Sequence, residues 1–248
     1  MRRYRQREPR DLVIALETSP RVPAVKDEGY DGYALFGMPF ESGHYLGLRR
    51  FPNAPVAGGF TSVWHRDPRG SWTIYSDVAP RNACARYFGA ELTSAQQAPI
   101  SVEWHGPRSF RVIVGDDIDW QMTLGTALGT SVLSALAPWL PETIMRSNRW
   151  LALLEPIAGA LLRAGKISLH GVAPNQQWYQ VNPRRLWVVR SAYATVGGEN
   201  VGPAGPLTEQ TRLGDLWLPQ RGIFTAYQAY LEAFDDIRHS TATQGTAH

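Results

Sequence analysis

The residues best placed for acid–base chemistry lie at the end of one predicted β-strand. The segment from Trp72 to Asp77 alternates, so Tyr75 and Asp77 share one face while Trp72 and Ile74 share the other. If Trp72 and Ile74 pack outward under helices, Asp77 faces the interior of a barrel near its mouth. Partial desolvation there favours the protonated acid, so the pattern predicts Asp77 as a general acid with Tyr75 as its hydrogen-bonding neighbour. The alternative is that Asp77 only caps the following loop.

Aromatic and charged residues on other predicted strands are candidates for binding a ligand. The sequence holds nine tryptophans and ten tyrosines, and a β-barrel lined by aromatic side chains with a few polar groups suits an apolar small molecule. An arginine near a strand can hold the anionic head group of such a ligand. The predicted ligand-binding residues are Trp64, Trp104, Asp119, Trp120, Trp187 and Arg221. The competing explanation is that the aromatic residues fill the core and the carboxylates pair with arginines.

The sequence shows no signature of metal or cofactor chemistry. His44, His65, His105 and His170 are far apart along the chain, although a barrel could bring them together. Nucleophile-elbow, dinucleotide-binding and phosphate-binding glycine motifs are all missing. We therefore expect no bound metal and no cofactor.

Successive β-hairpins are the elements that must position these residues. Residues 61–77 form the clearest hairpin, with β-branched and aromatic residues on both sides of the turn Asp67-Pro68-Arg69-Gly70. Segments 101–114 and 167–181 repeat the pattern, each with a histidine near a strand end and a proline in the turn. Hairpins in succession indicate an antiparallel meander.

Helical spacing of apolar residues appears in two places. It replaces the strand pattern between residues 126 and 163, and it recurs near the C-terminus at Phe224, Tyr227, Tyr230, Leu231 and Phe234. The sequence therefore predicts a mainly β fold, either a lipocalin-like antiparallel barrel or a curved sheet. It would carry a helical insertion at about 126–163 and a C-terminal helix. We expect one domain over 1–248, with loose ends at about 1–10 and 239–248.

Composition and net charge indicate which cellular compartment and which kinds of binding partner to expect. The net charge of +3 is small for 248 residues, and no nucleic-acid-binding pattern accompanies the basic arm from Arg2 to Arg10. That arm could meet an acidic protein, which keeps an interaction protein as one hypothesis. The lone cysteine, Cys84, fits a reducing, cytoplasmic setting. No apolar run reaches the roughly 18 residues of a membrane span, and no secretory signal follows the basic arm.

Long stretches of the chain resemble an uncharacterised actinobacterial protein family. These stretches are 32–51, 61–77, 182–198 and 202–224, and the resemblance brings no established activity. More distantly, the alternating strands resemble the lipocalin-like (calycin) barrels of carotenoid hydratases and related cyclases. In that family an Asp in a Tyr-x-Asp setting, near a Trp, is thought to protonate an alkene, and the matching residues here are Tyr75, Asp77 and Trp64. Those proteins are longer, usually with two barrel-like halves, and the helical insertion sets this chain apart.

Two functions follow from the residues and the resemblance. The first is binding of an apolar small molecule of the isoprenoid, polyene or acyl type in a barrel interior. The alternative is a cofactor-independent lyase, isomerase or cyclase of the hydratase kind. In that alternative Asp77 donates a proton, and the π face of Trp64 stabilises a developing carbocation.

Overall fold

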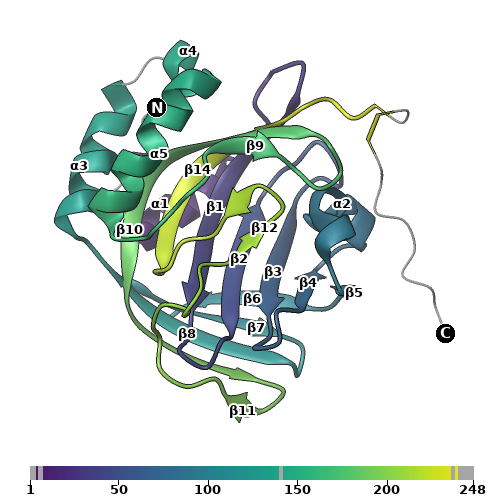
Figure 1. Ribbon diagram of the computed structural model, residues 1–248, viewed down its shortest axis with the longest axis vertical. Coiled ribbons are helices and arrows are strands. Elements are labelled where there is room, and N and C mark those ends of the chain that lie inside the picture. The colour runs from purple at the N-terminus through teal and green to yellow at the C-terminus, as the bar shows by residue number, and fades with distance from the viewer. Residues whose placement is uncertain (1–3, 5–7, 140–141, 236–237, 240–248) are drawn as a thin grey trace.

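A curled sheet of twelve strands dominates the computed structural model, which describes residues 4, 8–139, 142–235 and 238–239. Its main path runs β5-β4-β3-β2-β1-β14-β10-β8-β7-β6, with β9 and β11 paired to β10 (Figure 1). All pairs are antiparallel except β4 with β5. The sheet strands are β1 (Glu28–Pro39), β2 (Tyr45–Phe51), β3 (Phe60–Arg66), β4 (Trp72–Ser76), β5 (Ser94–Gln97), β6 (Ile100–Trp104), β7 (Ser109–Val114), β8 (Ile118–Gly125), β9 (His170–Val172), β10 (Trp178–Val196), β11 (Glu199–Asn200) and β14 (Ile223–Leu231).

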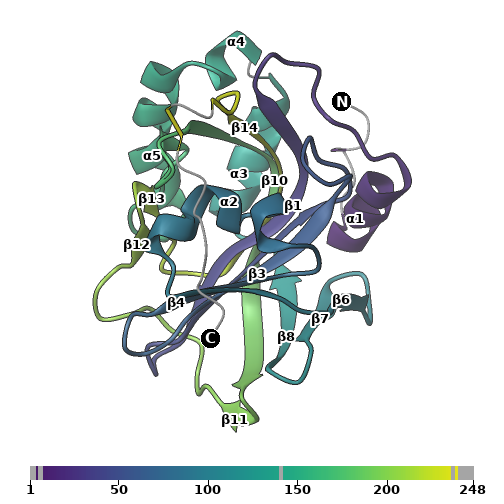
Figure 2. The ribbon, with the colours of Figure 1, turned by 90° about the vertical axis from the view of Figure 1, so that its right-hand side faces the viewer.

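Helices and short segments cover parts of the sheet. The α-helices are α1 (Pro9–Thr18), α2 (Ala85–Phe88), α3 (Leu128–Leu136), α4 (Glu142–Met145) and α5 (Asn148–Leu162). Three 3₁₀ turns, η2 (Pro80–Asn82), η3 (Gly89–Glu91) and η4 (Ala137–Trp139), and a small ribbon of β12 (Arg212–Leu213) and β13 (Leu216–Trp217) complete the structure. Figure 2 shows α3, α4 and α5 grouped beside β10, well away from α1. No helix within the described ranges is long and apolar enough to cross a membrane.

The sheet separates two hydrophobic cores. The inner core joins strands from both ends of the sheet, for example Val63 of β3 with Val112 of β7 and Trp120 of β8, so it lies inside the curl. Helix α1 contributes Leu16 to it. The outer core lies on the other face of β1–β4 and β14, under α2 and the β12–β13 ribbon. Large buried side chains of the inner core, among them Trp120 and Trp187, lie inside the curl, so this space is not an empty lumen.

The predicted mainly β fold with a curved sheet and a helical insertion is confirmed. The sheet ends at β5 and β6 without closing, which makes it a half-barrel. The turn of the first hairpin has the predicted form, because Gly70 N donates to Asp67 O at 3.0 Å and Asp67 Oδ1 accepts from Ser71 N at 2.8 Å. Gly70 has a positive φ of 95°, which a glycine adopts without strain.

The predicted C-terminal helix is wrong for the segment that begins at Phe224. That segment is strand β14, which lies between β1 and β10 in the middle of the sheet. Nearly all its residues are buried on both faces, so the alternation that marks a half-buried strand disappears. Its aromatic residues then fit a helical period by coincidence. The expected loose ends fall mostly outside the described residues, although α1 already begins at Pro9.

Candidate functional site

A closed aromatic cavity of about 70 Å³ lies in the outer core. Strands β1, β2, β3, β10 and β14 form its floor, while α2 and Leu216 of β13 cover it. Nine of its fifteen lining residues are aromatic: Tyr30, Phe36, Phe51, Phe60, Trp64, Tyr87, Phe88, Tyr179 and Tyr227. Most of these side chains are nearly or fully buried, and Trp64 packs against Phe88 with ring centroids 4.8 Å apart. The walls therefore match an apolar molecule.

One charged side chain, Arg49 of β2, lines this cavity and is only 4% exposed. Its guanidinium donates to the carbonyl oxygens of Leu35 at 2.7 Å, Leu48 at 2.9 Å and Phe36 at 3.0 Å. It also lies 4.4 Å from the ring centre of Phe36 and 4.6 Å from that of Trp64. Cation–π contacts of this kind compensate part of the cost of burying the charge.

Arg49 shares a face of β2 with Tyr45 and Phe51, and a β-bulge in β1 provides carbonyl groups that hold its side chain there. The pairing of β1 with β2 shifts register between Leu35 and Met38, so the carbonyls of Leu35 and Phe36 lie where the regular ladder is interrupted. Arg49 supplies donors to both carbonyls from the neighbouring strand. The next residue, Arg50, points to the opposite face of the sheet and binds Glu17 at 2.9 Å.

The positive charge of Arg49 has no negative partner. Among the described residues, no carboxylate lies within ion-pair distance of it, and its nearest titratable neighbours are Tyr227, Cys84 and Tyr45. Burial raises the pKa of each of these three groups, so they are neutral at physiological pH. Burial also lowers the pKa of Arg49, but a guanidinium remains protonated in a protein. A buried cation without an anion is costly, and a bound anion would remove that cost.

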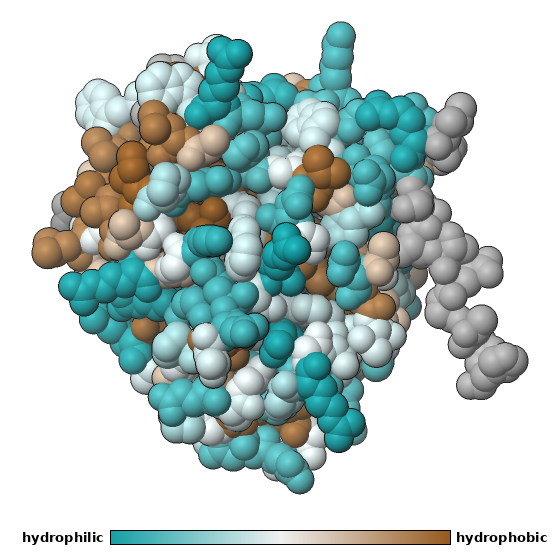
Figure 3. Space-filling model, in the orientation of Figure 1, coloured by the Kyte–Doolittle hydropathy of each residue, from teal (hydrophilic) through white to brown (hydrophobic). Residues whose placement is uncertain are grey.

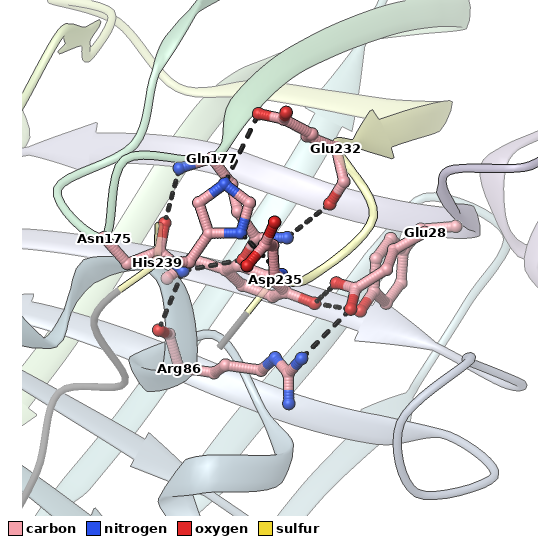
Figure 4. A network of polar contacts seen from close by, with 9 residues as sticks. Glu28, Arg86, Asn175, Gln177, Glu232, Asp235 and His239 are labelled. Carbon is pink, nitrogen blue, oxygen red and sulfur yellow. Dashed lines mark hydrogen bonds and ion pairs between the residues drawn. The ribbon is translucent and has the colours of Figure 1, made fainter. Parts of the chain in front are cut away.

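A polar network closes one end of the cavity. Tyr30 and Tyr87, both in the lining, share a short hydrogen bond between their hydroxyl groups, and Tyr87 donates to Glu28 Oε2 at 2.5 Å. Arg86 binds the other oxygen of Glu28 at 3.0 Å and stacks on Phe234 at 4.2 Å (Figure 4). Burial is the main reason why the pKa values of Tyr30 and Tyr87 are raised.

The C-terminal segment after β14 belongs to the same network. The side-chain amide of Gln177 donates to the carbonyl of Glu232, and Asn175 Nδ2 donates to Gln177 Oε1 at 2.7 Å (Figure 4). His239 is 3% exposed, and its Nδ1 accepts from Asp235 N at 2.8 Å. The segment is therefore attached over α2 by buried polar groups.

A second cavity of about 40 Å³ lies beside the first, beneath the end of α5. Phe36 lines both cavities, and Leu162, Trp217 and Ile223 are among the other lining residues of the second one. The Phe36 side chain therefore lies between the two spaces.

Asp77 lines a different feature, an open cleft of about 560 Å³ between α1 and the rim of the sheet. Tyr33, Arg50, Thr61 and Trp104 line the same cleft. Trp72 and Ile74 pack in the outer core and Tyr75 in the inner one, so the strand faces are as predicted. Asp77 Oδ1 accepts from Thr61 N at 2.7 Å, so this contact joins Asp77 to β3 across the hairpin, whereas the predicted alternative is a cap on the loop that follows Asp77.

The structure does not bring Tyr75, Asp77 and Trp64 together. Trp64 pairs with Ile74 across the hairpin and so lies on the opposite face from Tyr75. Burial raises the pKa of Tyr75, and the carboxylate that adds to this shift is Asp117 rather than Asp77. An acid role for Asp77 would therefore act in the open cleft, without Trp64.

The other predicted ligand-binding residues lie apart from the closed cavity. Trp104 lines the open cleft, while Trp120 and Trp187 are fully buried in the inner core. Asp119 faces outward on β8 and forms two 2.7 Å hydrogen bonds with Arg111, which hold its pKa below the usual range. Arg221 lies under the helical insertion, where it donates to Leu162 O at 3.4 Å. Only Trp64 of this set lines the aromatic cavity.

Two histidines that are distant in sequence do meet. His44 Nδ1 and His65 Nε2 are 2.9 Å apart, and the rings stack with centroids separated by 5.2 Å. Burial, followed by repulsion from His44, lowers the pKa of His65 to about 4. Within the described part of the chain, no group of three or more histidine, cysteine or acidic residues has the geometry of a metal site.

Sequence reasoning missed Arg49 and the residues of α2. The pair Arg49-Arg50 reads as an exposed strand segment, because nothing in the sequence marks the bulge whose carbonyl groups hold Arg49 in the cavity wall. One sequence signal could have indicated that Arg49 is buried. Arg49 shares a strand face with the aromatic residues Tyr45 and Phe51 and with the small residue Gly47.

Comparisons with known proteins leave the family open. Neither a protein-family model nor a curated protein sequence matches this chain. A solved structure described as "Structural Studies of Acetoacetate Decarboxylase" is similar over 95% of this chain and 94% of that chain, with 11% sequence identity and a TM-score of 0.39. A likeness that weak carries no conclusion about activity or site. The expected kinship with calycin barrels of the carotenoid hydratase type remains a prediction.

Proposed function

We propose that the protein binds a small apolar molecule that carries a carboxylate or a similar anionic group. The observation that supports this is Arg49, a buried guanidinium that lies in the wall of an aromatic cavity and has no acidic partner among the residues the structure describes. The anion would bind to Arg49, and the apolar body would pack against the aromatic walls. An acyl or aromatic carboxylic acid has this shape and charge.

The composition of the cavity favours binding over turnover. Its lining residues include no lysine, histidine, aspartate or glutamate, and burial raises the pKa of the thiol of Cys84. Groups that act as general bases or nucleophiles near neutral pH are therefore not in contact with the bound molecule. The size of the cavity also favours a short apolar body, and a longer isoprenoid or polyene body would have to displace Phe36.

The experiment is a calorimetric titration with carboxylates of increasing chain length, from butyrate to decanoate, each compared with its neutral amide. We expect the carboxylates to bind and the amides to bind at least about tenfold more weakly, because only the carboxylate neutralises Arg49. Protection of Cys84 from a small methylating reagent would localise the ligand, since this thiol lines the cavity. Equal binding of acids and amides, or no protection of Cys84, would contradict the proposal.

The second candidate is a cofactor-independent lyase or isomerase that uses Asp77. The observation in its favour is the open cleft, where Asp77 lies among Tyr33, Trp104 and Arg50 and where a substrate has room to enter. Its test is turnover of an alkene or enol substrate by the protein and by Asp77→Asn. Identical turnover by both proteins would exclude Asp77 as the acid.

A further inference from the structure

Helix α3 exposes three large apolar side chains, although Leu133 is partly buried, and its fully buried residues are small or polar. The buried residues of this helix are Gly129, Thr130 and Ser134. Its exposed residues include Leu128, Val132 and Leu136, with exposed fractions of 88%, 45% and 55%. This is the reverse of the usual arrangement, in which the apolar stripe of a surface helix faces the core.

Helix α5 and the turn before α4 continue the same surface. Trp139, Trp150, Leu153, Ile157 and Leu161 are all exposed, Trp139 by 84%. Of the twelve large apolar side chains exposed in the described residues, eight lie between residues 128 and 161. Figure 3 shows a brown area on the side of the molecule where Figure 1 places α3 and α5. We call these eight residues the outer face, and a contiguous apolar area of this kind on a folded protein marks an interaction site.

Polar contacts hold the helices on the sheet. Arg146 binds Asp27 at 2.8 Å, and Gln180 Nε2 donates to Asn148 Oδ1 at 2.6 Å. Glu155 accepts from the backbone N–H of Leu169 at 2.6 Å. The attachment of the insertion therefore does not use the outer face, which remains available to a partner.

Positive charge lies at the edge of the outer face. Arg163 ends α5, Arg221 donates to the carbonyl of Leu162, and Arg190 donates to that of Thr126 just before α3. Burial lowers the pKa of Arg221, and the positive charges of Arg190 and Arg163 lower it further. None of the three has an acidic partner in the described part of the chain.

We propose that the outer face binds peripherally to the surface of a bilayer that contains anionic phospholipids. The aliphatic side chains would enter the boundary between head groups and acyl chains, where Trp139 and Trp150 also fit, because indole rings favour that depth. The arginine cluster would contact anionic head groups. With nine and fifteen residues, α3 and α5 are suited to lying in the interface rather than spanning it. The arginine cluster also favours a lipid surface over a second copy of this chain, whose own arginines would repel it.

The test is co-sedimentation of the full chain with vesicles of phosphatidylcholine alone or mixed with phosphatidylglycerol. We expect binding to the mixed vesicles that weakens as salt is added, and little binding to the neutral ones. The double variant Leu153→Ser/Ile157→Ser should partition at least about tenfold more weakly, because two exposed apolar side chains are lost. The double variant Arg163→Asn/Arg190→Gln should bind the mixed vesicles about fivefold more weakly for each arginine that is replaced. Asn tolerates the positive φ of 52° at position 163.

The matched control is Tyr193→Ser, which removes a 50% exposed large side chain from the far end of β10. This variant should bind vesicles like the unchanged protein, whether or not the aromatic cavity binds a ligand. Failure of the unchanged protein to bind mixed vesicles would overturn the proposal, as would full binding by Leu153→Ser/Ile157→Ser. A dimer in light scattering that this double variant converts to a monomer, without vesicle binding, would assign the outer face to a second copy instead.

Discussion

Replacing Arg49 by methionine should separate ligand binding from folding. Three of the five N–H groups of this guanidinium donate to backbone carbonyls, which leaves two for a carboxylate. Each charge-assisted hydrogen bond contributes about 1.5–3 kcal/mol, so the loss of two should weaken carboxylate binding by about 3 kcal/mol or more. That corresponds to an affinity about 100-fold lower, measured by calorimetric titration.

Stability of the unliganded protein should change much less in the same variant. The carbonyls of Leu35 and Phe36 lose their donors, which costs about 1–3 kcal/mol each. The variant also no longer buries an uncompensated cation, which offsets several kcal/mol. We therefore expect the free energy of unfolding in urea to differ from that of the unchanged protein by less than about 2 kcal/mol.

Arg50→Met is the matched control, because Arg50 lies next to Arg49 on the same strand but points to the opposite face. It should lose no more than about 1 kcal/mol of stability with its partly exposed partner Glu17, and its ligand affinity should not change. The reasoning is refuted if Arg49→Met binds carboxylates within about threefold of the unchanged protein. It is also refuted if this variant loses affinity for neutral amides as strongly as for acids.

Three further predictions concern other parts of the molecule. Asp77→Ala should lower the free energy of unfolding by about 1 kcal/mol, because Thr61 N loses its acceptor, and Asp77→Asn should lower it less, because its amide oxygen can still accept; equal losses would contradict a stabilising role for this hydrogen bond. His65 has a pKa of about 4 when folded, below its unfolded value, so the unfolded chain binds a proton that the folded chain resists. The contribution of this lowered pKa to the free energy of unfolding is complete above about pH 6.5 and is lost as the pH drops towards 4. It amounts to about 3 kcal/mol. Urea unfolding of His65→Gln should show a pH dependence smaller by that amount, and an unchanged dependence would contradict the assignment. Phe36→Ala joins the two cavities and should shift calorimetric preference from short to longer carboxylates, with a stability loss of about 2–3 kcal/mol; an unchanged preference would show that Phe36 does not limit ligand length.

The parts of the fold that could be predicted from sequence are those specified by local chemistry. The turn at Asp67 and Gly70 has a positive-φ glycine and a backbone-bonding aspartate, and both act as predicted. The helical insertion has a period that strands do not share. The segment that begins at Phe224 could not be assigned, because burial on both faces removes the alternation that distinguishes a strand.

The candidate site was less predictable than the fold, because it depends on long-range register. The alternation of Trp72 to Asp77 placed each side chain on the correct face. Which face holds the closed cavity was not encoded in that pattern, since it depends on where α2 and the β12–β13 ribbon pack. The carbonyl groups that hold Arg49 in the cavity wall lie at a bulge in the neighbouring strand, and a bulge has no signature in the strand that faces it.

The adjacent arginines of β2 contact two different environments, and the alternation of this one strand determines which arginine reaches which. Arg49 reaches the closed cavity, while its neighbour Arg50 reaches the open cleft, and only the two-residue period of the strand keeps them apart. Insertion or deletion of one residue within Tyr45–Phe51 would exchange the faces of the two arginines. Arg50, the partner of Glu17, would then point into the aromatic cavity, and Arg49 would point to solvent. Tolerance to length changes should therefore be high in the loops and close to zero in this strand, which makes β2 the segment where natural or engineered variation is most constrained.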